Sequence, residues 1–203
     1  SPLTFGFLAI GNDFDLIYFS YKRYIAEMLS VGVIPLWSPV DGGGFSLIFN
    51  PFAQYFYLPG WTLYIIHFVT KNLSLHVFLL YTVLAISIFS LGIYYWLKSL
   101  KIDQTIAFFS ALIIACSLKV TELLRFPNAA HAIAWVPWAL YGINLIIEKD
   151  YKKSFFIIFF SNLFIITAGY PYFIVYSLFL FIPYIIFIPF LFYDYGSKKF
   201  NYK

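Results

Sequence analysis

Residues 73–97 read LSLHVFLLYTVLAISIFSLGIYYWL and contain no Asp, Glu, Lys or Arg. A helix that crosses the hydrocarbon core of a bilayer needs about 20 mostly apolar residues, and this stretch meets that requirement. Residues 154–193 also lack charged side chains, but they are too long for a single crossing. Because the Gly-Tyr-Pro sequence at 169–171 interrupts them, we expect two helices there, over 154–168 and 172–193.

Two further apolar stretches lie between these segments. Residues 104–118 (QTIAFFSALIIACSL) and 129–147 (AAHAIAWVPWALYGINLII) are each predicted to span, and Pro137 is expected to kink the second. Together with the segments above, they bring the predicted count to five spans. The predicted fold class is all-α, a polytopic transmembrane helical bundle with a long extracytoplasmic loop that contains amphipathic and interfacial helices.

The composition agrees with a membrane protein and excludes a soluble one. Of the 203 residues, 62% are hydrophobic, 24% are aromatic and only 11% are charged. Soluble domains carry about 25% charged residues, so this chain cannot cover a surface that faces water. The formal net charge of +4 is small, and we therefore expect the lipid bilayer, not a nucleic acid, as the partner.

The lysines predict the orientation of the spans. Loops 98–103, 148–153 and 194–203 are separated by two spans each, so they fall on one face, and they hold eight of the 13 Lys and Arg residues. The opposite loops, 119–128 and 169–171, hold only two. The positive-inside rule places the lysine-rich face in the cytoplasm.

Residues 61–70 (WTLYIIHFVT) decide on which face the N-terminal segment lies. They are apolar, but at 1.5 Å rise per residue they reach only about 15 Å, half of the hydrocarbon thickness. We therefore expect an interfacial or re-entrant helix, so that residues 1–60 share the outer face of loops 119–128 and 169–171. If 61–70 spanned instead, residues 1–60 would be cytoplasmic.

The chain is expected to form two units. Residues 1–72 are predicted to be an extracytoplasmic loop with amphipathic and interfacial helices, and residues 73–203 an incomplete transmembrane bundle of about five spans. A first spanning helix is expected to precede Ser1. The glycine run at 42–44 is expected to form a tight turn, with close backbone approach to a ligand or another segment as the alternative.

An amphipathic helix is predicted over about 15–30, preceded by two carboxylates. Asp13 and Asp15 could serve as an N-cap that accepts free amide protons, or as a general base near the membrane surface. One aspartate could take each task. Lys22 and Arg23 are expected on a solvated helix face or at lipid headgroups.

A second polar cluster precedes the third span and holds Glu122, Arg125, Asn128 and His131. Arg125 could grip a phosphate through its planar fork of donors, and His131 could donate a hydrogen bond or relay a proton. Alternatively, Arg125 only reaches lipid headgroups and His131 lines a polar helix end. The topology places this cluster on the same face as the aspartates.

Other kinds of site find little support. The glycine run lacks the Lys-Ser/Thr of a phosphate-binding P-loop, and the histidines lack partners with metal-ligand spacing. No metal site and no cofactor is predicted, although Asp13 with Asp15 could hold one Mg²⁺.

Several short motifs are spread over most of the chain. They are Gly11-Asn12-Asp13, Ala26-Glu27, GVIPLWSP at 32–39, Gly42-Gly43-Gly44, Asn50, Tyr57-Leu58-Pro59, Arg125-Phe126-Pro127-Asn128 through His131, Trp135, Pro137 and Ala168-Gly169-Tyr170-Pro171. In this order the motifs resemble the YfhO-like bacterial membrane proteins, members of the glycosyltransferase C (GT-C) superfamily. Ile17, where a Gln is often found, and Ser46, where a Pro is expected, depart from the pattern.

The resemblance implies a membrane glycosyltransferase of the bacterial cytoplasmic membrane, with its active site on the extracytoplasmic side. Such an enzyme transfers a sugar from a polyprenyl-phosphate donor to an envelope glycan or lipid acceptor. By position, Asp13 is the catalytic carboxylate and Asp15 the second candidate. The candidate lipid-phosphate and substrate-binding residues are Arg125, His131, Glu122, Asn128 and Tyr170.

Two other functions fit a polytopic, aromatic-rich chain. A transporter or lipid flippase would carry charged residues within its spans, whereas the polar residues here collect at one face. A non-catalytic assembly subunit would use Asp13 only as a cap and Arg125 only as a headgroup anchor.

Overall fold

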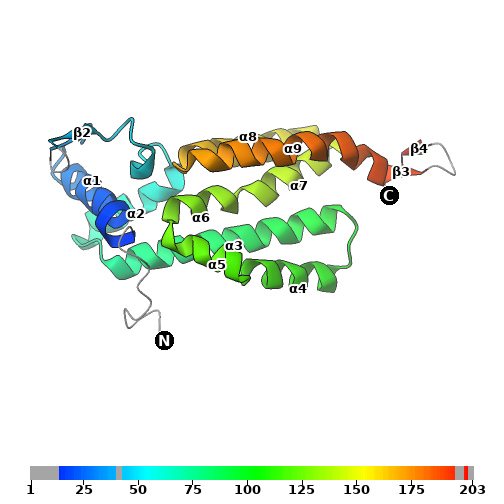
Figure 1. Cartoon of the computed structure of the whole chain (residues 1–203), viewed down its shortest axis with the longest axis horizontal. Coiled ribbons are helices and arrows are strands. Elements are labelled where there is room, and N and C mark those ends of the chain that lie inside the picture. Colours follow the sequence, from blue (N-terminus) through cyan, green and yellow to red (C-terminus); the bar gives the residue numbers. More distant parts are fainter. Residues whose placement is uncertain (1–13, 40–42, 195–198, 201–203) are drawn as a thin grey trace.

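Residues 14–39, 43–194 and 199–200 are described by the computed structural model, and Figure 1 shows them as a long helical bundle with a smaller lobe at one end. The lobe comprises the described residues from 14 to 70, and the bundle residues 75–192. The protein is mostly helical, as the sequence predicts.

The lobe contains helical segments and one short hairpin. Its elements are the π-helix η1 (Phe14–Phe19), α1 (Ser20–Ser30), β1 (Trp37–Ser38), β2 (Phe45–Ser46), the 3₁₀-helices η2 (Pro51–Ala53) and η3 (Leu58–Gly60), and α2 (Trp61–Thr70). η1 continues directly into α1, so the two cover the range predicted for the amphipathic helix. Gly32 follows with φ +80°, a conformation that glycine adopts without strain.

The hairpin explains the glycine run. β1 and β2 are antiparallel, with Trp37 opposite Ser46. Gly43 and Gly44 have φ of +82° and +102°, and a Cβ at Gly44 would collide with the Trp37 indole. The described part of the run is therefore a turn that leaves room for an aromatic ring, and Gly42 lies outside the described residues.

The bundle consists of helices that run along one long axis (Figure 1). They are α3 (Leu75–Ser99), α4 (Gln104–Ala115), α5 (Leu118–Glu122), η4 (Leu123–Arg125), α6 (Pro127–Ala134), α7 (Val136–Ile147), α8 (Tyr151–Thr167) and α9 (Pro171–Phe192). A short antiparallel pair, β3 (Tyr193–Asp194) and β4 (Lys199–Phe200), follows α9.

Three helical segments are long and apolar enough to cross a membrane, judged by length and composition alone. They are α3, the α6–α7 segment Pro127–Ile147, and Pro171–Phe190 of α9. α4 and residues 118–125 make a fourth only if this pair, bent by 44°, is one broken span. α8, with 17 residues, is at the lower limit of spanning length. The described residues thus support three or four of the five predicted spans.

Two of the predicted spans differ in detail from the structure. The helix expected over 104–118 ends at Ala115, because Ser117 is extended (φ −63°, ψ 148°) and starts the short α5. The helix expected over 129–147 breaks at Trp135, with Pro137 in the first turn of α7. The helix is thus interrupted two residues before Pro137, where the kink is predicted.

Small residues set the spacing of the bundle helices. α3 packs on α4, α6 and α7, and α7 packs on α8. A Cβ at Gly92 of α3 would collide with the Trp138 indole of α7, and one at Gly142 would press on Ile158 of α8. Both glycines therefore permit close helix packing around α7.

Polar contacts show which loops share an end of the bundle. The Lys101 ammonium lies 3.8 Å from a Glu148 carboxylate oxygen, which joins the lysine-rich loops 98–103 and 148–153. At the other end, Gln54 Nε2 donates a hydrogen bond to the Ala168 carbonyl over 2.7 Å. The lobe thus lies at the end of loop 169–171, away from the lysines, as predicted if residues 61–70 do not span.

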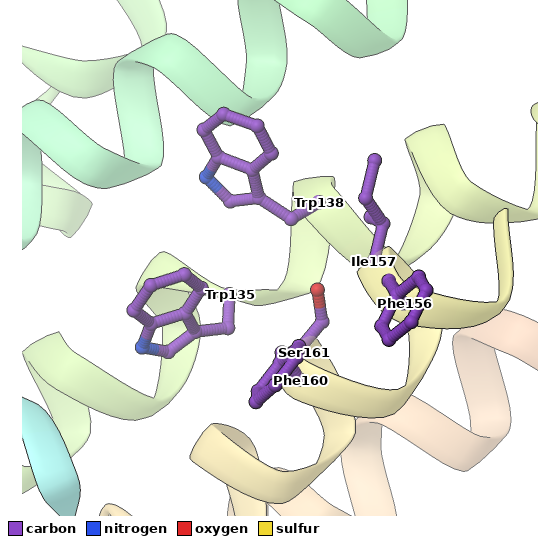
Figure 2. Close-up of a pocket in the computed structure, with 6 residues that line it drawn as sticks. All are labelled: Trp135, Trp138, Phe156, Ile157, Phe160 and Ser161. Carbon is purple, nitrogen blue, oxygen red and sulfur yellow. The ribbon is translucent and has the colours of Figure 1, made fainter. Parts of the chain in front are cut away.

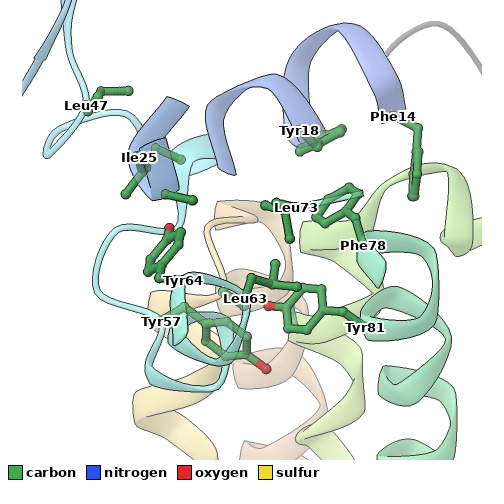
Figure 3. Packing of buried hydrophobic residues seen from close by; sticks show 14 residues of the cluster. Phe14, Tyr18, Ile25, Leu47, Tyr57, Leu63, Tyr64, Leu73, Phe78 and Tyr81 are labelled. Atoms are coloured by element: carbon green, nitrogen blue, oxygen red, sulfur yellow. The ribbon is translucent and has the colours of Figure 1, made fainter. Parts of the chain in front are cut away.

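The lobe shares a hydrophobic core with the bundle. Figure 3 shows aromatic side chains from η1, the 51–60 segment and α3 packed together, among them Phe14, Tyr57, Phe78 and Tyr81. Tyr57 is fully buried and Phe78 nearly so. We call this region, where residues 51–60 meet α3, α6 and the 168–169 turn, the junction.

Candidate functional site

Three segments that are distant in sequence are tied together by Asn128. Its Nδ2 donates to the carbonyls of Pro51 (3.3 Å), Phe52 (3.3 Å) and Gly169 (3.2 Å). Gly169 has φ +76°, and a Cβ there would collide with the Pro51 carbonyl. Asn128, predicted to bind substrate, is 1% exposed and acts as a clamp between lobe and bundle.

A second tie runs through the Tyr57 hydroxyl. It accepts a hydrogen bond from Trp135 Nε1 (2.9 Å) and lies 3.1 Å from His131 Nδ1. Because the indole can only donate, the Tyr57 proton is free to point to His131 Nδ1. The neutral His131 ring then carries its proton on Nε2, which is buried without a partner among the described residues.

Tyr81 closes this cluster from the side of α3. Its ring stacks on the His131 ring with centroids 4.1 Å apart and planes inclined by 28°. Its hydroxyl is buried and has no hydrogen-bond partner among the described residues. Figure 3 shows the Tyr57 and Tyr81 hydroxyls directed into the same interior region. Burial raises the pKa of Tyr57, which therefore stays neutral.

Lys22 also belongs to the junction, and the prediction of a solvated face was wrong. Its side chain is 1% exposed, and its Nζ lies 3.0 Å from the Ala53 carbonyl. The signal was in the sequence: Tyr18 and Ile25 lie four residues before and three after Lys22, on the buried face of the helix. Arg23 has the predicted exposed position and pairs with Glu27 at 2.8 Å.

Arg125 and Glu122 lie in a different environment from His131. Both are exposed, and Glu122 pairs with Lys119 at 3.4 Å. Arg125 ends η4, two residues before α6 begins. The four residues of the predicted cluster therefore divide into two exposed side chains on the surface and two enclosed ones, Asn128 and His131.

The aspartates and Tyr170 complete the predicted set. Asp13 lies outside the described residues. Asp15 is exposed and is the second residue of η1, so it lies inside the first turn and not at the N-cap. In this position its carboxylate is still stabilised by the positive end of the helix dipole. Tyr170 precedes α9 and contacts the rings of Tyr172 and Phe173.

Two apolar cavities lie between α7 and α8. Figure 2 shows one of about 170 Å³, in which the Ser161 hydroxyl points toward the two indole rings. Its lining is Trp135, Trp138, Phe156, Ile157, Phe160 and Ser161. The other, of about 440 Å³, is lined by residues between Ile146 and Phe159. Neither is lined by a predicted site residue, although Trp135 links the first to Tyr57.

A metal site is not apparent in the described part of the chain, where no three His, Cys, Asp or Glu side chains come together. A magnesium site between Asp13 and Asp15 would involve a residue outside that part. In comparisons with known proteins, no family model, no curated protein and no solved structure matches this chain.

Proposed function

We propose that the chain is part of a bacterial membrane glycosyltransferase that moves a sugar from a polyprenyl-phosphate donor to an extracytoplasmic envelope glycan or lipid. One observation carries the proposal. Three of the motif stretches that resemble GT-C proteins, at 50–59, 125–137 and 168–171, meet at the junction. Asn128 and Tyr57 make the connecting hydrogen bonds.

The position of the junction suits a lipid-phosphate donor. The bundle presents apolar side chains to its surroundings, for example Phe155 and Phe179, which are 64% and 76% exposed. Such a surface would face hydrocarbon, and a prenyl chain would lie along it. Arg125, exposed at the lobe end, would then hold the phosphate through a bidentate pair of hydrogen bonds.

The chemistry assigns two separate tasks to charged residues. As the bond between sugar and phosphate breaks, negative charge on the leaving phosphate is stabilised by the guanidinium of Arg125. A carboxylate on the acceptor side takes the proton of the attacking hydroxyl, and we assign this task to Asp13, with Asp15 as the second candidate. Because His131 and Asn128 are each 1% exposed, we assign them to positioning the surrounding backbone.

The chain's placement in the membrane is part of the same proposal. We assign five spans, counting α4–α5 as one broken span and α8 as a short one, with the lysine-rich loops in the cytoplasm. α2 would lie in the outer interface, with Ile65, Phe68 and Val69 toward the acyl chains, because these are exposed while Leu63 and Tyr64 are buried. Lys71 directly follows α2 and could reach headgroups.

A transporter or flippase is less well supported. Such proteins place charged side chains inside their spans. Among the described Lys, Arg, Asp and Glu residues, Lys22 alone is buried, and it lies in the lobe.

The test uses the complete natural polypeptide in membranes, with a panel of polyprenyl-phosphate hexoses as donors. Asp13→Asn should lower sugar transfer by about 10²–10⁴-fold, the usual contribution of a general base. Arg125→Lys should also lower transfer, because the guanidinium fork is lost. Arg23→Lys, an exposed arginine in the lobe, is the matched control and should leave transfer unchanged. Full transfer by Asp13→Asn would overturn the assignment, and Asp15→Asn would then be tested in its place.

A further inference from the structure

Lys22 enters the junction with no carboxylate beside it in the described part of the chain. Its Nζ lies 3.0 Å from the Ala53 carbonyl, 3.5 Å from the Gln54 carbonyl and 3.4 Å from the Tyr64 hydroxyl. Among the described residues no carboxylate lies within ion-pair distance of it. A buried ammonium with no counter-charge is strongly disfavoured.

The three partners can accept from an ammonium, and they can also serve a neutral amine. A neutral lysine has two N–H groups and one lone pair, whereas an ammonium has three N–H groups and no acceptor. Two of the partners, the carbonyls of Ala53 and Gln54, can only accept. The third, the Tyr64 hydroxyl, can donate to the lone pair. The Tyr64 ring also lies 5.6 Å from Nζ, and this cation–π contact is a weak force in favour of the charged form.

The titratable and charged groups that the structure describes around Lys22 do not supply a negative charge to it. They are Tyr18 from η1, Arg23 and Glu27 from α1, Tyr55 and Tyr57 from the 51–60 segment, Tyr64 and His67 from α2, Tyr81 from α3, and His131 from α6. Glu27 is exposed and paired with Arg23. Burial raises the pKa of Tyr64, so its phenol stays neutral. Burial lowers the pKa of Lys22 from 10.5 to about 7.

We propose that Lys22 is a proton-operated latch between the lobe and the bundle: the lobe is held closed by the neutral amine, and it loosens when the amine takes up a proton. The latch sits at the centre of the contact. A Cβ at Gly60 would lie 3.3 Å from Lys22 Nζ and 3.2 Å from the Tyr81 hydroxyl, so both flank the same glycine. Opening would give water to the charged amine and to the hydroxyl that has no partner.

The direction of the pH dependence follows from the two pKa values. In the open lobe Lys22 would regain its ordinary pKa of 10.5, whereas in the closed lobe it is about 7. Between these values the open state binds more protons, so closure weakens as the pH falls from about 10 to about 7. Below the lower value both states are charged and Lys22 causes no further change.

Hydrogen exchange of the intact protein in lipid nanodiscs tests the latch. The observable is the protection of backbone amides in residues 51–60 at pH 6–10, after correction for the intrinsic exchange rate at each pH. In the wild type, protection should increase with pH above about 7, by up to about tenfold per pH unit, since one proton is released on closure. In Lys22→Met this slope should vanish, and in Arg23→Met, the exposed neighbour, it should persist.

Two results would overturn the latch. A flat profile in the wild type would mean that Lys22 keeps one charge state over the whole range. A slope that persists in Lys22→Met would mean that another group titrates. If Lys22→Met does not fold, Lys22→Arg serves instead. Its guanidinium stays charged, so protection should be low at every pH and independent of pH, and wild-type protection in this variant would equally contradict the latch.

Discussion

The two ends of the bundle differ in how well their buried polar side chains are hydrogen-bonded. At the lysine-rich end, Trp96 Nε1 donates to the Tyr184 hydroxyl (2.7 Å), which donates to Asn144 Oδ1 (2.6 Å), and Asn144 Nδ2 donates to Ser99 Oγ (2.7 Å). Each of these side-chain groups has a partner, and the network fastens α3, α7 and α9 to one another.

The lobe end is different. The buried side-chain atoms without a partner in the described residues are Gln54 Oε1, His67 Nδ1, Tyr81 OH and His131 Nε2, and they all belong to the lobe or to the helices beneath it. Lys22 adds a buried amine for which the described residues provide no counter-charge. Unsatisfied polar groups cost stability and are rare in natural proteins. Their concentration marks the lobe end as the candidate functional end of the molecule.

Among the variants that test the contrast between the two ends, Gly169→Ala at the lobe end should cause the largest loss of stability. A methyl group there would meet the Pro51 carbonyl in a backbone with φ +76°, so we expect a loss of more than about 3 kcal/mol in unfolding free energy. Gly43→Ala is the matched control, because its φ is +82° and no atom lies within 4 Å of the added Cβ. It should cost only about 1–2 kcal/mol. Denaturant unfolding in detergent measures both, and equal losses would contradict the clamp.

Asn128→Leu should follow in size, with a loss of about 3 kcal/mol, because the carbonyls of Pro51, Phe52 and Gly169 lose their donor. Asn162→Leu is the control, since within the described structure Asn162 donates to the Ile158 carbonyl of its own helix, and it should cost less than about 1 kcal/mol. Amide exchange should locate the loss of protection at residues 51–54. A uniform loss over the whole bundle would argue against a local clamp.

Tyr184→Phe probes the lysine-rich end. The hydroxyl has partners on both sides, Trp96 and Asn144, so we expect a loss of about 1–3 kcal/mol in unfolding free energy. A change below about 0.5 kcal/mol would show that this network does not stabilise the bundle.

Tyr81→Phe should give the smallest change. Its hydroxyl is buried without a partner among the described residues, so its removal should change the unfolding free energy by less than about 0.5 kcal/mol or raise it slightly. The difference between Tyr81→Phe and Tyr184→Phe expresses the contrast between the two ends. Equal losses of unfolding free energy in the two variants would contradict the contrast between the two ends.

The sequence predicts the helices and their polarity well. Apolar length, the Gly-Tyr-Pro turn at 169–171 and Pro137 correctly locate most helix boundaries, because they depend on local geometry and on solvation by lipid. Loop parity also places the lobe at the end away from the lysines, which the contact between Gln54 and Ala168 confirms.

The site was harder to predict, because it depends on which side chains the tertiary packing encloses. Asn128 and His131 had the polarity of ligand-binding residues but turn inward, since α6 packs under the lobe. Lys22 carries a charge that normally marks the surface, and its position on an apolar helix face was the only sign of burial. In the sequence, Tyr57 stands out only as part of the Tyr57-Leu58-Pro59 motif. Its contact with His131 joins residues 74 positions apart, so no local pattern predicts it.

Membrane sidedness is the property on which the proposed chemistry depends, and thiol labelling of intact cells measures it directly. In a Cys116→Ala background, chosen because Cys116 is exposed, single cysteines replace Val31 in the lobe and Lys149 in the α7–α8 loop. A membrane-impermeant maleimide should label Val31→Cys in intact cells, and Lys149→Cys only after permeabilisation. Labelling of Lys149→Cys alone in intact cells would put the lobe in the cytoplasm and contradict the proposed extracytoplasmic site.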